Sequence, residues 1–287
     1  MNAAGKTVNV AALQMCSGDD VARNLDVVDD LLDEAVREDC QLVVLPENVA
    51  FVGRNDRDKL AHAEVEGDGP IQQRLKESAK HHALWIIAGS LPLASGNEDR
   101  CFGASMVFDP HGQLRGCYRK IHLFDVDLPD RDERYRESAS MMHGDDMVVV
   151  DTAAGRTGLS ICYDVRFPEL YRCLSKRGAT VLTVPAAFTS VTGAAHWQVL
   201  LRARAIENLA YVIAPGQHGQ HPNGRQTYGH SMIIDPWGRV LGERAAGDGL
   251  VVATLETDLP ERLRRDFPVL QHRRIGIQQD QDIERKL

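Results

Sequence analysis

The chain has 287 residues, of which 43% are hydrophobic and 26% charged, and its formal net charge is −8. This composition is typical of a folded globular protein. The acidic balance disfavours general nucleic-acid binding, which needs a basic face. No segment approaches the ~18 uninterrupted apolar residues of a membrane span. The N-terminus lacks an apolar signal region, and the six cysteines show neither CxxC nor zinc-finger spacing. We therefore expect a cytoplasmic protein with reduced thiols and no metal.

The first third of the chain alternates short apolar runs with longer amphipathic segments. Residues 8–13, 41–45 and 84–91 are predicted strands, and residues 21–37 and 71–82 have helical spacing. This alternation favours a parallel sheet covered by helices.

The middle of the chain changes character. Residues 104–109 and 113–120 predict a β-hairpin around a Pro-His-Gly turn. Residues 125–143 are charged and without period, and loops of that length in compact domains are often functional.

The second half resumes the alternation. It predicts strands at 147–151, 158–162, 181–184, 211–214 and 250–255, helices at 167–176 and 196–209, and a hairpin of 230–235 with 239–243. No linker or internal repeat divides the chain, so we expect one domain over residues 1–287, with a core of about 7–257. The pattern predicts two mixed sheets packed face to face, with helices outside both.

Three polar residues occupy the ends of predicted strands. Glu47 follows the apolar run 42–46, Cys162 lies between a strand and a helix, and Lys120 closes the second strand of the hairpin. Ligands of open α/β sheets bind at the carboxyl ends of strands. From position alone, Cys162 could instead be a buried structural cysteine, Glu47 a helix N-terminal carboxylate and Lys120 a solvated hairpin end.

These three residue types suit the cleavage of an amide. A free thiol has a pKa of about 8.5, so it needs a base or a cation to react at neutral pH. A carboxylate can take its proton. A lysine, together with the backbone N–H of Tyr163, can stabilise the oxyanion of the tetrahedral intermediate.

Three separated motifs carry a resemblance to a known family. They are Leu45-Pro46-Glu47, the segment YRKIHLFD at 118–125 and the segment ICYDVRFPE at 161–169. With these motifs in order, residues 8–274 resemble the nitrilase superfamily, also called carbon–nitrogen hydrolases. The resemblance implies a four-layer α-β-β-α sandwich that forms a homodimer or a higher homo-oligomer, with the tail 258–287 at the dimer interface.

The resemblance also implies roles for individual residues. Glu47 corresponds to the general base, Lys120 to the oxyanion-stabilising lysine and Cys162 to the nucleophile of a thioester mechanism. Glu137 corresponds to a second glutamate that orients the lysine, although a surface charge is the alternative for a residue in this loop. The mechanism needs no cofactor and no metal.

Within the superfamily, the sequence is most similar to the deaminated glutathione amidase branch. The segments that carry this similarity are 187–197, 200–207, 228–232, 235–238 and 271–274. The implied substrate is a small amide with carboxylates, deaminated glutathione, which would yield 2-oxoglutarate and cysteinylglycine. Residues 141–144, Met-Met-His-Gly, depart from the aromatic-Thr-Pro-Gly turn of many relatives, beside the expected pocket.

An anionic substrate calls for cations in the pocket. The expected substrate contacts are Arg166, Phe188, Thr189, Trp197 and Arg202. Arg166 could instead pair with Glu169 or Asp164. Trp197 could be a core or interface residue, and Arg202 and its neighbour Arg204 could face solvent or a dimer partner.

Other functions remain as alternatives. A serine hydrolase lacks its GxSxG motif here, and a metallohydrolase would use histidines such as His218 and His221 without an HExxH helix. A scaffold with an inactive triad is a non-enzymatic alternative. Within the family, the nearest competitor is an ω-amidase acting on 2-oxoglutaramate or 2-oxosuccinamate, and an aliphatic nitrilase or carbamoylase is more remote.

Overall fold

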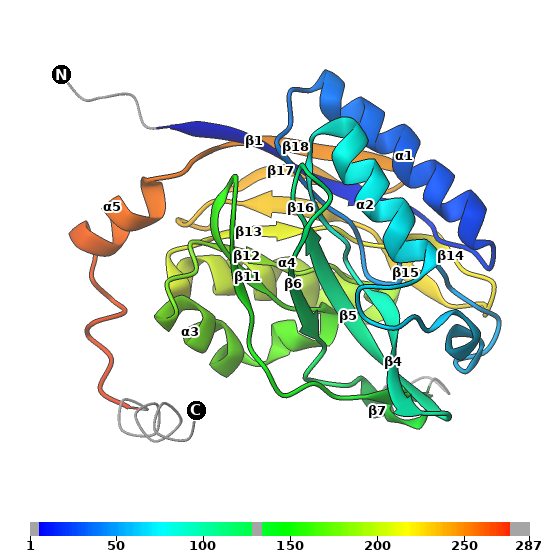
Figure 1. Ribbon diagram of the computed structural model, residues 1–287. Helices are drawn as coiled ribbons and strands as arrows, with labels where there is room; N and C mark the ends of the chain where they lie inside the picture. Colours follow the sequence, from blue (N-terminus) through cyan, green and yellow to red (C-terminus); the bar gives the residue numbers. More distant parts are fainter. Residues whose placement is uncertain (1–5, 128–133, 276–287) are drawn as a thin grey trace.

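The computed structural model describes residues 6–127 and 134–275. Two β-sheets pack face to face, and helices cover the outer face of each, so the fold is a four-layer α-β-β-α sandwich (Figure 1). The expected fold class is confirmed. No helix in these two ranges is long and apolar enough to cross a membrane.

The first sheet is mixed, with β1, β2 and β3 parallel to one another. Its strands, in spatial order, are β18 (Gly249–Glu256), β1 (Thr7–Gln14), β2 (Leu42–Val44), β3 (Trp85–Ile87), β5 (Arg100–Phe108) and β4 (Leu91–Asn97). Two further strands, β6 (Leu114–Arg119) and β9 (Met141–Met142), also pair with β5.

The second sheet is also mixed, and β11, β12 and β13 form its parallel part. Its strands, in spatial order, are β10 (Val149–Thr152), β11 (Gly155–Leu159), β12 (Val181–Thr183), β13 (Tyr211–Ala214), β16 (Ser231–Ile234) and β17 (Val240–Arg244). Two small hairpins lie outside both sheets, namely β7 (Asp125–Asp127) with β8 (Arg134–Arg136), and β14 (His218–Gln220) with β15 (Gln226–Tyr228).

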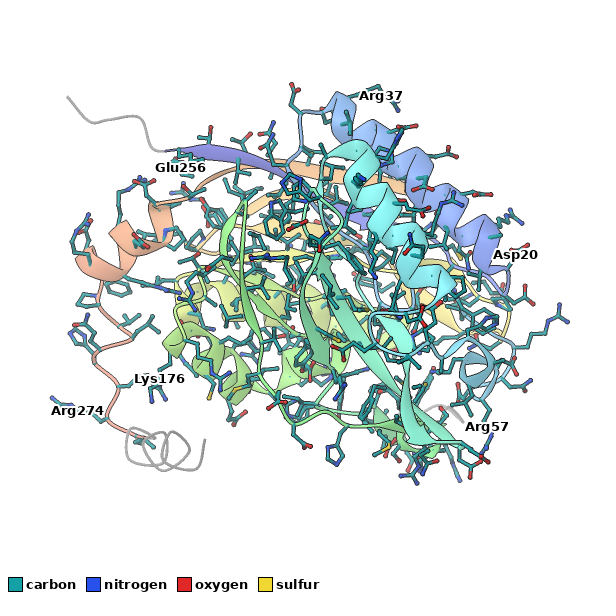
Figure 2. All side chains as sticks on the ribbon, viewed as in Figure 1. Asp20, Arg37, Arg57, Lys176, Glu256 and Arg274 are labelled. Carbon is teal, nitrogen blue, oxygen red and sulfur yellow. The ribbon has the colours of Figure 1, made fainter. Side chains whose placement is uncertain are left out.

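The helices divide between the two outer layers. Helices α1 (Val21–Arg37) and α2 (Pro70–His82) pack together on the first sheet, and α3 (Pro168–Lys176) and α4 (Ser190–Asn208) pack together on the second (Figure 1). A short helix, α5 (Leu259–Asp266), follows β18. Asp20 caps α1 by accepting a hydrogen bond from the Arg23 N–H at 3.1 Å, and Asp20 and Arg37 mark the two ends of that helix (Figure 2).

Strand β1 shows how the sequence builds two apolar layers. Successive side chains of a strand point to opposite faces of the sheet. Val10 and Ala12 belong to the core between the sheets, whereas Ala11 and Leu13 belong to the core beneath α1 and α2. An unbroken apolar run is therefore what a strand buried on both faces requires.

Most predicted elements are confirmed, and three differ. The predicted strand 84–91 is split between β3 and β4, because Gly89 turns the chain with a φ of 54°. Helix α4 begins at Ser190 rather than at residue 196, because Thr189 caps it. The predicted strand 158–162 stops at Leu159, three residues before Cys162, which begins the next turn.

Candidate active site

Glu47 lies just beyond β2, where Pro46 takes the chain out of the sheet, and only 5% of its surface is exposed. The turn at Gly89 packs against this point so closely that a Cβ there would come 1.9 Å from the Pro46 carbonyl oxygen. The Gln217 side-chain amide donates to the Glu47 carbonyl oxygen at 3.0 Å, and the Ala187 N–H donates to its Oε2 at 2.7 Å. Glu47, which follows a strand of the first sheet, is therefore also held by residues that follow strands of the second sheet.

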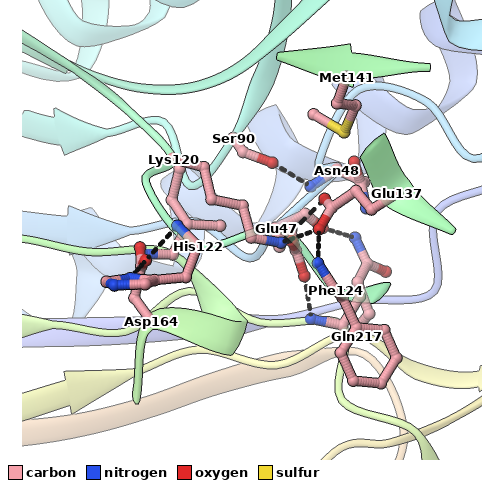
Figure 3. A network of polar contacts seen from close by, with 12 residues as sticks. Glu47, Asn48, Ser90, Lys120, His122, Phe124, Glu137, Met141, Asp164 and Gln217 are labelled. Atoms are coloured by element: carbon pink, nitrogen blue, oxygen red, sulfur yellow. Dashed lines mark hydrogen bonds and ion pairs between the residues drawn. The ribbon is translucent and has the colours of Figure 1, made fainter. Parts of the chain in front are cut away.

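Lys120 follows β6, and its ammonium group lies between two carboxylates (Figure 3). The Nζ atom donates to Glu47 Oε1 at 2.9 Å and to the two oxygens of Glu137 at 2.9 and 3.0 Å. Glu137 in turn accepts a hydrogen bond from the Phe124 N–H at 2.6 Å. Only 2% of the Lys120 surface is exposed, so its orientation is fixed by these buried charges.

Cys162 opens a short 3₁₀ turn, Cys162–Arg166, that follows β11. Its φ of 49° is in the left-handed region, which is strained for a residue other than glycine and is found most often at functional sites. The Cys162 N–H donates to the Pro185 carbonyl oxygen at 2.8 Å. The thiol and the carboxylate of Glu47 are close enough for each to shift the pKa of the other.

Asp164 joins the segment that carries Lys120 to the turn that carries Cys162. Its fully buried carboxylate accepts hydrogen bonds from the Tyr118 hydroxyl at 2.7 Å and from the Ile161 N–H at 2.8 Å. It also accepts from the His122 N–H at 3.1 Å and contacts His122 Nδ1 at 2.7 Å. These bonds, some of which Figure 3 shows, fix the ammonium group and the thiol relative to each other.

Burial and charge set the protonation states of the cluster. Burial alone would raise the pKa of Glu47, but the charge and hydrogen bond of Lys120 prevail and lower it. Burial would lower the pKa of Lys120, yet the charges of Glu137 and Glu47 hold it well above its usual range. Burial and the Glu47 charge raise the pKa of the Cys162 thiol, against the opposing effect of Lys120. The resting cluster is therefore an ionised glutamate beside a protonated thiol.

These groups line one cavity. Glu47, Lys120, Glu137, Cys162 and Tyr163 are all on its wall. The structure thus brings together the five residues to which the sequence analysis assigned catalytic roles. An ionised carboxylate, a thiol and a buried ammonium group in one cleft can carry out nucleophilic attack with general base assistance.

Three of the expected substrate contacts also line the cavity, namely Arg166, Phe188 and Thr189. The Arg166 guanidinium lies 5.1 Å from the ring centroid of Phe188 and 3.2 Å from His196 Nδ1. The described residues show no ion pair between Arg166 and either Glu169 or Asp164, so its positive charge is available to a ligand.

Two expected contacts are not at the cavity wall in the described part of the chain. Trp197 is buried in the core, where its Nε1–H donates to the His230 carbonyl oxygen at 2.9 Å and its ring supports Phe188. Arg202 donates from Nε to the Gly238 carbonyl oxygen at 2.9 Å. The substrate contacts expected of Trp197 and Arg202 are therefore not supported. Arg204, its neighbour, is buried and pairs with Glu207.

Sequence reasoning missed three cations of the cavity, Lys59, Arg136 and Arg225, of which Arg136 pairs with Asp127. Lys59 belongs to a short 3₁₀ helix, Asp58–His62, and its Nζ lies 3.6 Å from Met141 Sδ. The sequence segment that departs from many relatives therefore contacts a residue of the cavity. Arg225 lies in the polar loop between β14 and β15, and no local pattern distinguishes it from a solvated loop arginine.

The histidines of the metallohydrolase alternative are engaged elsewhere. His218 Nε2 contacts Asp248 at 2.7 Å, and His221 contacts the Ser17 carbonyl oxygen and the Thr227 hydroxyl. Within residues 6–127 and 134–275, no group of three or more His, Cys, Asp or Glu side chains is arranged to hold a metal ion.

Comparison with known proteins agrees with this geometry. The family model described as carbon–nitrogen hydrolase matches residues 9–265. The chain is 47% identical to a deaminated glutathione amidase of Synechocystis over 92% of this chain and 97% of that protein. It is 43% identical to a deaminated glutathione amidase of Yersinia enterocolitica over 94% of each chain.

A solved structure has the same fold. The C. elegans NitFhit protein superposes with a TM-score of 0.87 at 39% identity, over 95% of this chain and 66% of that protein. The chain thus spans about two thirds of that fusion protein. By sequence, by fold and by the residues gathered in its cavity, the chain belongs to the carbon–nitrogen hydrolase family and is a hydrolase of carbon–nitrogen bonds other than peptide bonds.

Proposed function

We propose that this protein is a cysteine amidase that hydrolyses deaminated glutathione to 2-oxoglutarate and cysteinylglycine. The observation that carries the proposal is the buried cluster of Glu47, Lys120 and Cys162 at one cavity with free cationic groups. The names of the Synechocystis and Yersinia relatives support the choice of substrate.

The first half of the reaction forms a thioester. Glu47 takes the proton of Cys162 as the sulfur attacks the amide carbonyl carbon. Because the resting thiol is protonated and Glu47 is ionised, proton transfer accompanies attack instead of preceding it. The tetrahedral intermediate then collapses, Glu47 returns the proton to the leaving nitrogen, and the amine departs.

The oxyanion of that intermediate needs donors already in place. Lys120 supplies an ammonium group whose position Glu47 and Glu137 fix. The second donor is the backbone N–H of Tyr163, since the N–H of Cys162 is already bonded to Pro185. Loss of one such donor typically costs about 10²–10³ in rate.

The second half regenerates the enzyme. Water enters the site vacated by the amine, Glu47 removes its proton, and the hydroxide attacks the thioester carbonyl. The acid departs as the sulfur regains its proton from Glu47. The same carboxylate thus serves both halves, and no cofactor or metal takes part.

The acyl half of the substrate ends in an oxo acid, and we place its carboxylate near Arg166. That guanidinium is half-buried and lies over Phe188. Thr189, which caps α4, and Thr192, in its first turn, line the same cavity, and the N-terminus of a helix favours an anion.

The test is a comparison of kcat/KM for deaminated glutathione and 2-oxoglutaramate. We expect a clear preference for deaminated glutathione, and no turnover of either substrate by Cys162→Ala, whose fold stays intact. A preference for 2-oxoglutaramate would move the assignment to ω-amidase. Full activity of Cys162→Ala would end the proposal, and an inactive wild type would favour the scaffold alternative.

We also propose a homodimer formed by single-domain subunits of residues 1–287. Val199, Ile206, Trp237 and Phe267 are large apolar side chains that are 46–69% exposed, and they lie on α4 and the segments beside it. The ring centroids of Trp237 and Phe267 are 5.9 Å apart. Such an exposed apolar patch is typical of an interface. The tail 258–287 would join this interface, but residues 276–287 lie outside the described part.

We also propose a cytoplasmic location, which fits the six cysteines, all of which are free thiols.

A further inference from the structure

A second cavity lies beside the first and shares part of its wall. This outer cavity has a volume of about 650 Å³. It shares four wall residues with the catalytic cavity, namely Asp56, Tyr135, Thr189 and Arg225. A molecule bound at Cys162 that extends past these shared residues would reach the outer cavity.

The outer cavity is lined by positive charge, although the chain as a whole is acidic. Its described ionisable wall residues are three arginines, Arg54, Arg134 and Arg225, and one aspartate, Asp56. Arg54 pairs with Asp19 at 3.1 Å, and Arg134 approaches Asp127 only to 3.9 Å. Both of these side chains are more than 70% exposed, so they can turn toward a ligand.

Arg225 stands where the two cavities meet. Its Nη2 donates to the Ala187 carbonyl oxygen, and its guanidinium lies over the ring of Tyr135 at 5.1 Å. Its Nε atom is buried and has no hydrogen-bond partner among the described residues. A buried donor without an acceptor is costly, so a ligand oxygen at this point would be bound favourably. Its charge also lowers the pKa of both Glu47 and Cys162.

We infer that the outer cavity is a subsite for a leaving amine that carries a carboxylate, and that Arg54, Arg134 and Arg225 select for that charge. The inference rests on the proposed amidase function. A leaving group of two residues spans about 7 Å, which takes its terminal carboxylate beyond the catalytic cluster. Ammonia, as a leaving group, does not reach this subsite. The arginines therefore favour an N-substituted amide over a primary amide with the same acyl group.

The experiment holds the acyl group constant and varies the leaving group. The three substrates are deaminated glutathione, the same compound with its glycine carboxylate converted to a carboxamide, and 2-oxoglutaramate. The measurement is kcat/KM for each, in wild type, Arg54→Gln, Arg134→Gln and Arg225→Lys. The control is Arg57→Gln, because Arg57 is exposed, pairs with Asp99 and lies outside both cavities (Figure 2).

Wild type should prefer the carboxylate substrate over its carboxamide analogue. That preference should fall by about threefold to fivefold in Arg54→Gln and Arg134→Gln, since an exposed charge pair is worth about that factor. Arg225→Lys should also lower this preference, because lysine lacks the planar guanidinium group that binds a carboxylate through two hydrogen bonds. The control should keep the wild-type ratio.

Two results would overturn the inference. One is equal turnover of the carboxylate and carboxamide substrates by wild type. The other is a fall in kcat/KM by the same factor for all three substrates in the arginine variants, which would indicate that the arginines have a structural role. Failure of wild type to hydrolyse any of the three is a different outcome, since it would remove the proposed amidase function itself.

Discussion

The ammonium nitrogen of Lys120 lies 2.9 Å from a carboxylate oxygen of Glu47, although the two residues are 73 positions apart and belong to different strand ends. Glu137 binds the same nitrogen through both of its oxygens. A buried carboxylate and a partly buried one thus share one cation. The arrangement keeps Glu47 ionised inside the protein, which is the state that a general base requires.

Removing the shared cation should destabilise the fold. In Lys120→Met, the buried Glu47 and the partly buried Glu137 lose their shared counter-charge, and we expect a loss of about 3 kcal/mol in the free energy of unfolding at pH 7. Because the pKa of Glu47 is lowered in the native protein, its stabilisation is present above the unfolded-state pKa and is lost as pH falls. In the variant, burial without the cation raises the pKa of Glu47, so the difference between variant and wild type should begin to shrink above pH 4.5 and continue to shrink below it. Urea unfolding at several pH values tests this, and a difference independent of pH would contradict it.

The pH profile of kcat/KM should follow the protonation of Glu47. Burial favours the neutral acid, but the charge of Lys120 prevails and lowers the pKa of Glu47 below its ordinary value of 4.5. The activity of the free enzyme should therefore remain level from pH 8 to pH 5 and decline only below pH 4.5. An acid limb centred near pH 6 would mean that another group is the base.

Alkylation of Cys162 separates a general base mechanism from a preformed thiolate. In Glu47→Gln the base is absent, so iodoacetamide should modify Cys162 about 100-fold more slowly at pH 7. Were the thiol already ionised, loss of the neighbouring negative charge would stabilise the thiolate and the modified fraction would not fall. Mass spectrometry of the peptide containing Cys162 gives the rate. Glu169→Gln, which alters an exposed glutamate at the start of α3, is the control.

Asp164 should act through the residues that it positions. Asp164→Asn replaces an acceptor of several hydrogen bonds with a group that donates from one side, at a cost of about 2–3 kcal/mol in stability. Small displacements of Lys120 and Cys162 should lower kcat by about 10–100-fold while KM changes little. Asp151→Asn, at an exposed pair with Arg156, should leave both parameters unchanged. A large rise in KM with normal kcat would contradict a positioning role.

Much of the fold follows from local patterns in the sequence. The apolar run of β1 predicts a strand buried on both faces, and the spacing of α1 gives that helix its observed bounds, Val21–Arg37. Local patterns also predict the strand ends that carry Glu47 and Lys120. The catalytic cluster followed from three motifs together, since each of its residues alone has an ordinary structural explanation.

The remaining features depend on contacts between distant segments. The φ of 49° at Cys162 is imposed by the Pro185 carbonyl oxygen and by Asp164, which no local pattern reveals. Gly89 breaks the predicted strand because the Pro46 backbone approaches it. Arg225 enters the cavity through the placement of the β14–β15 hairpin, and loop sequences do not specify that placement.

The account depends most directly on the covalent intermediate. Rapid acid quenching during turnover of deaminated glutathione, followed by mass spectrometry of the digested protein, measures where the acyl group is attached. We predict a 2-oxoglutaryl thioester on the peptide that contains Cys162, and on none of the other five cysteines. Steady turnover with no adduct, or with the adduct on another residue, would contradict the proposed mechanism.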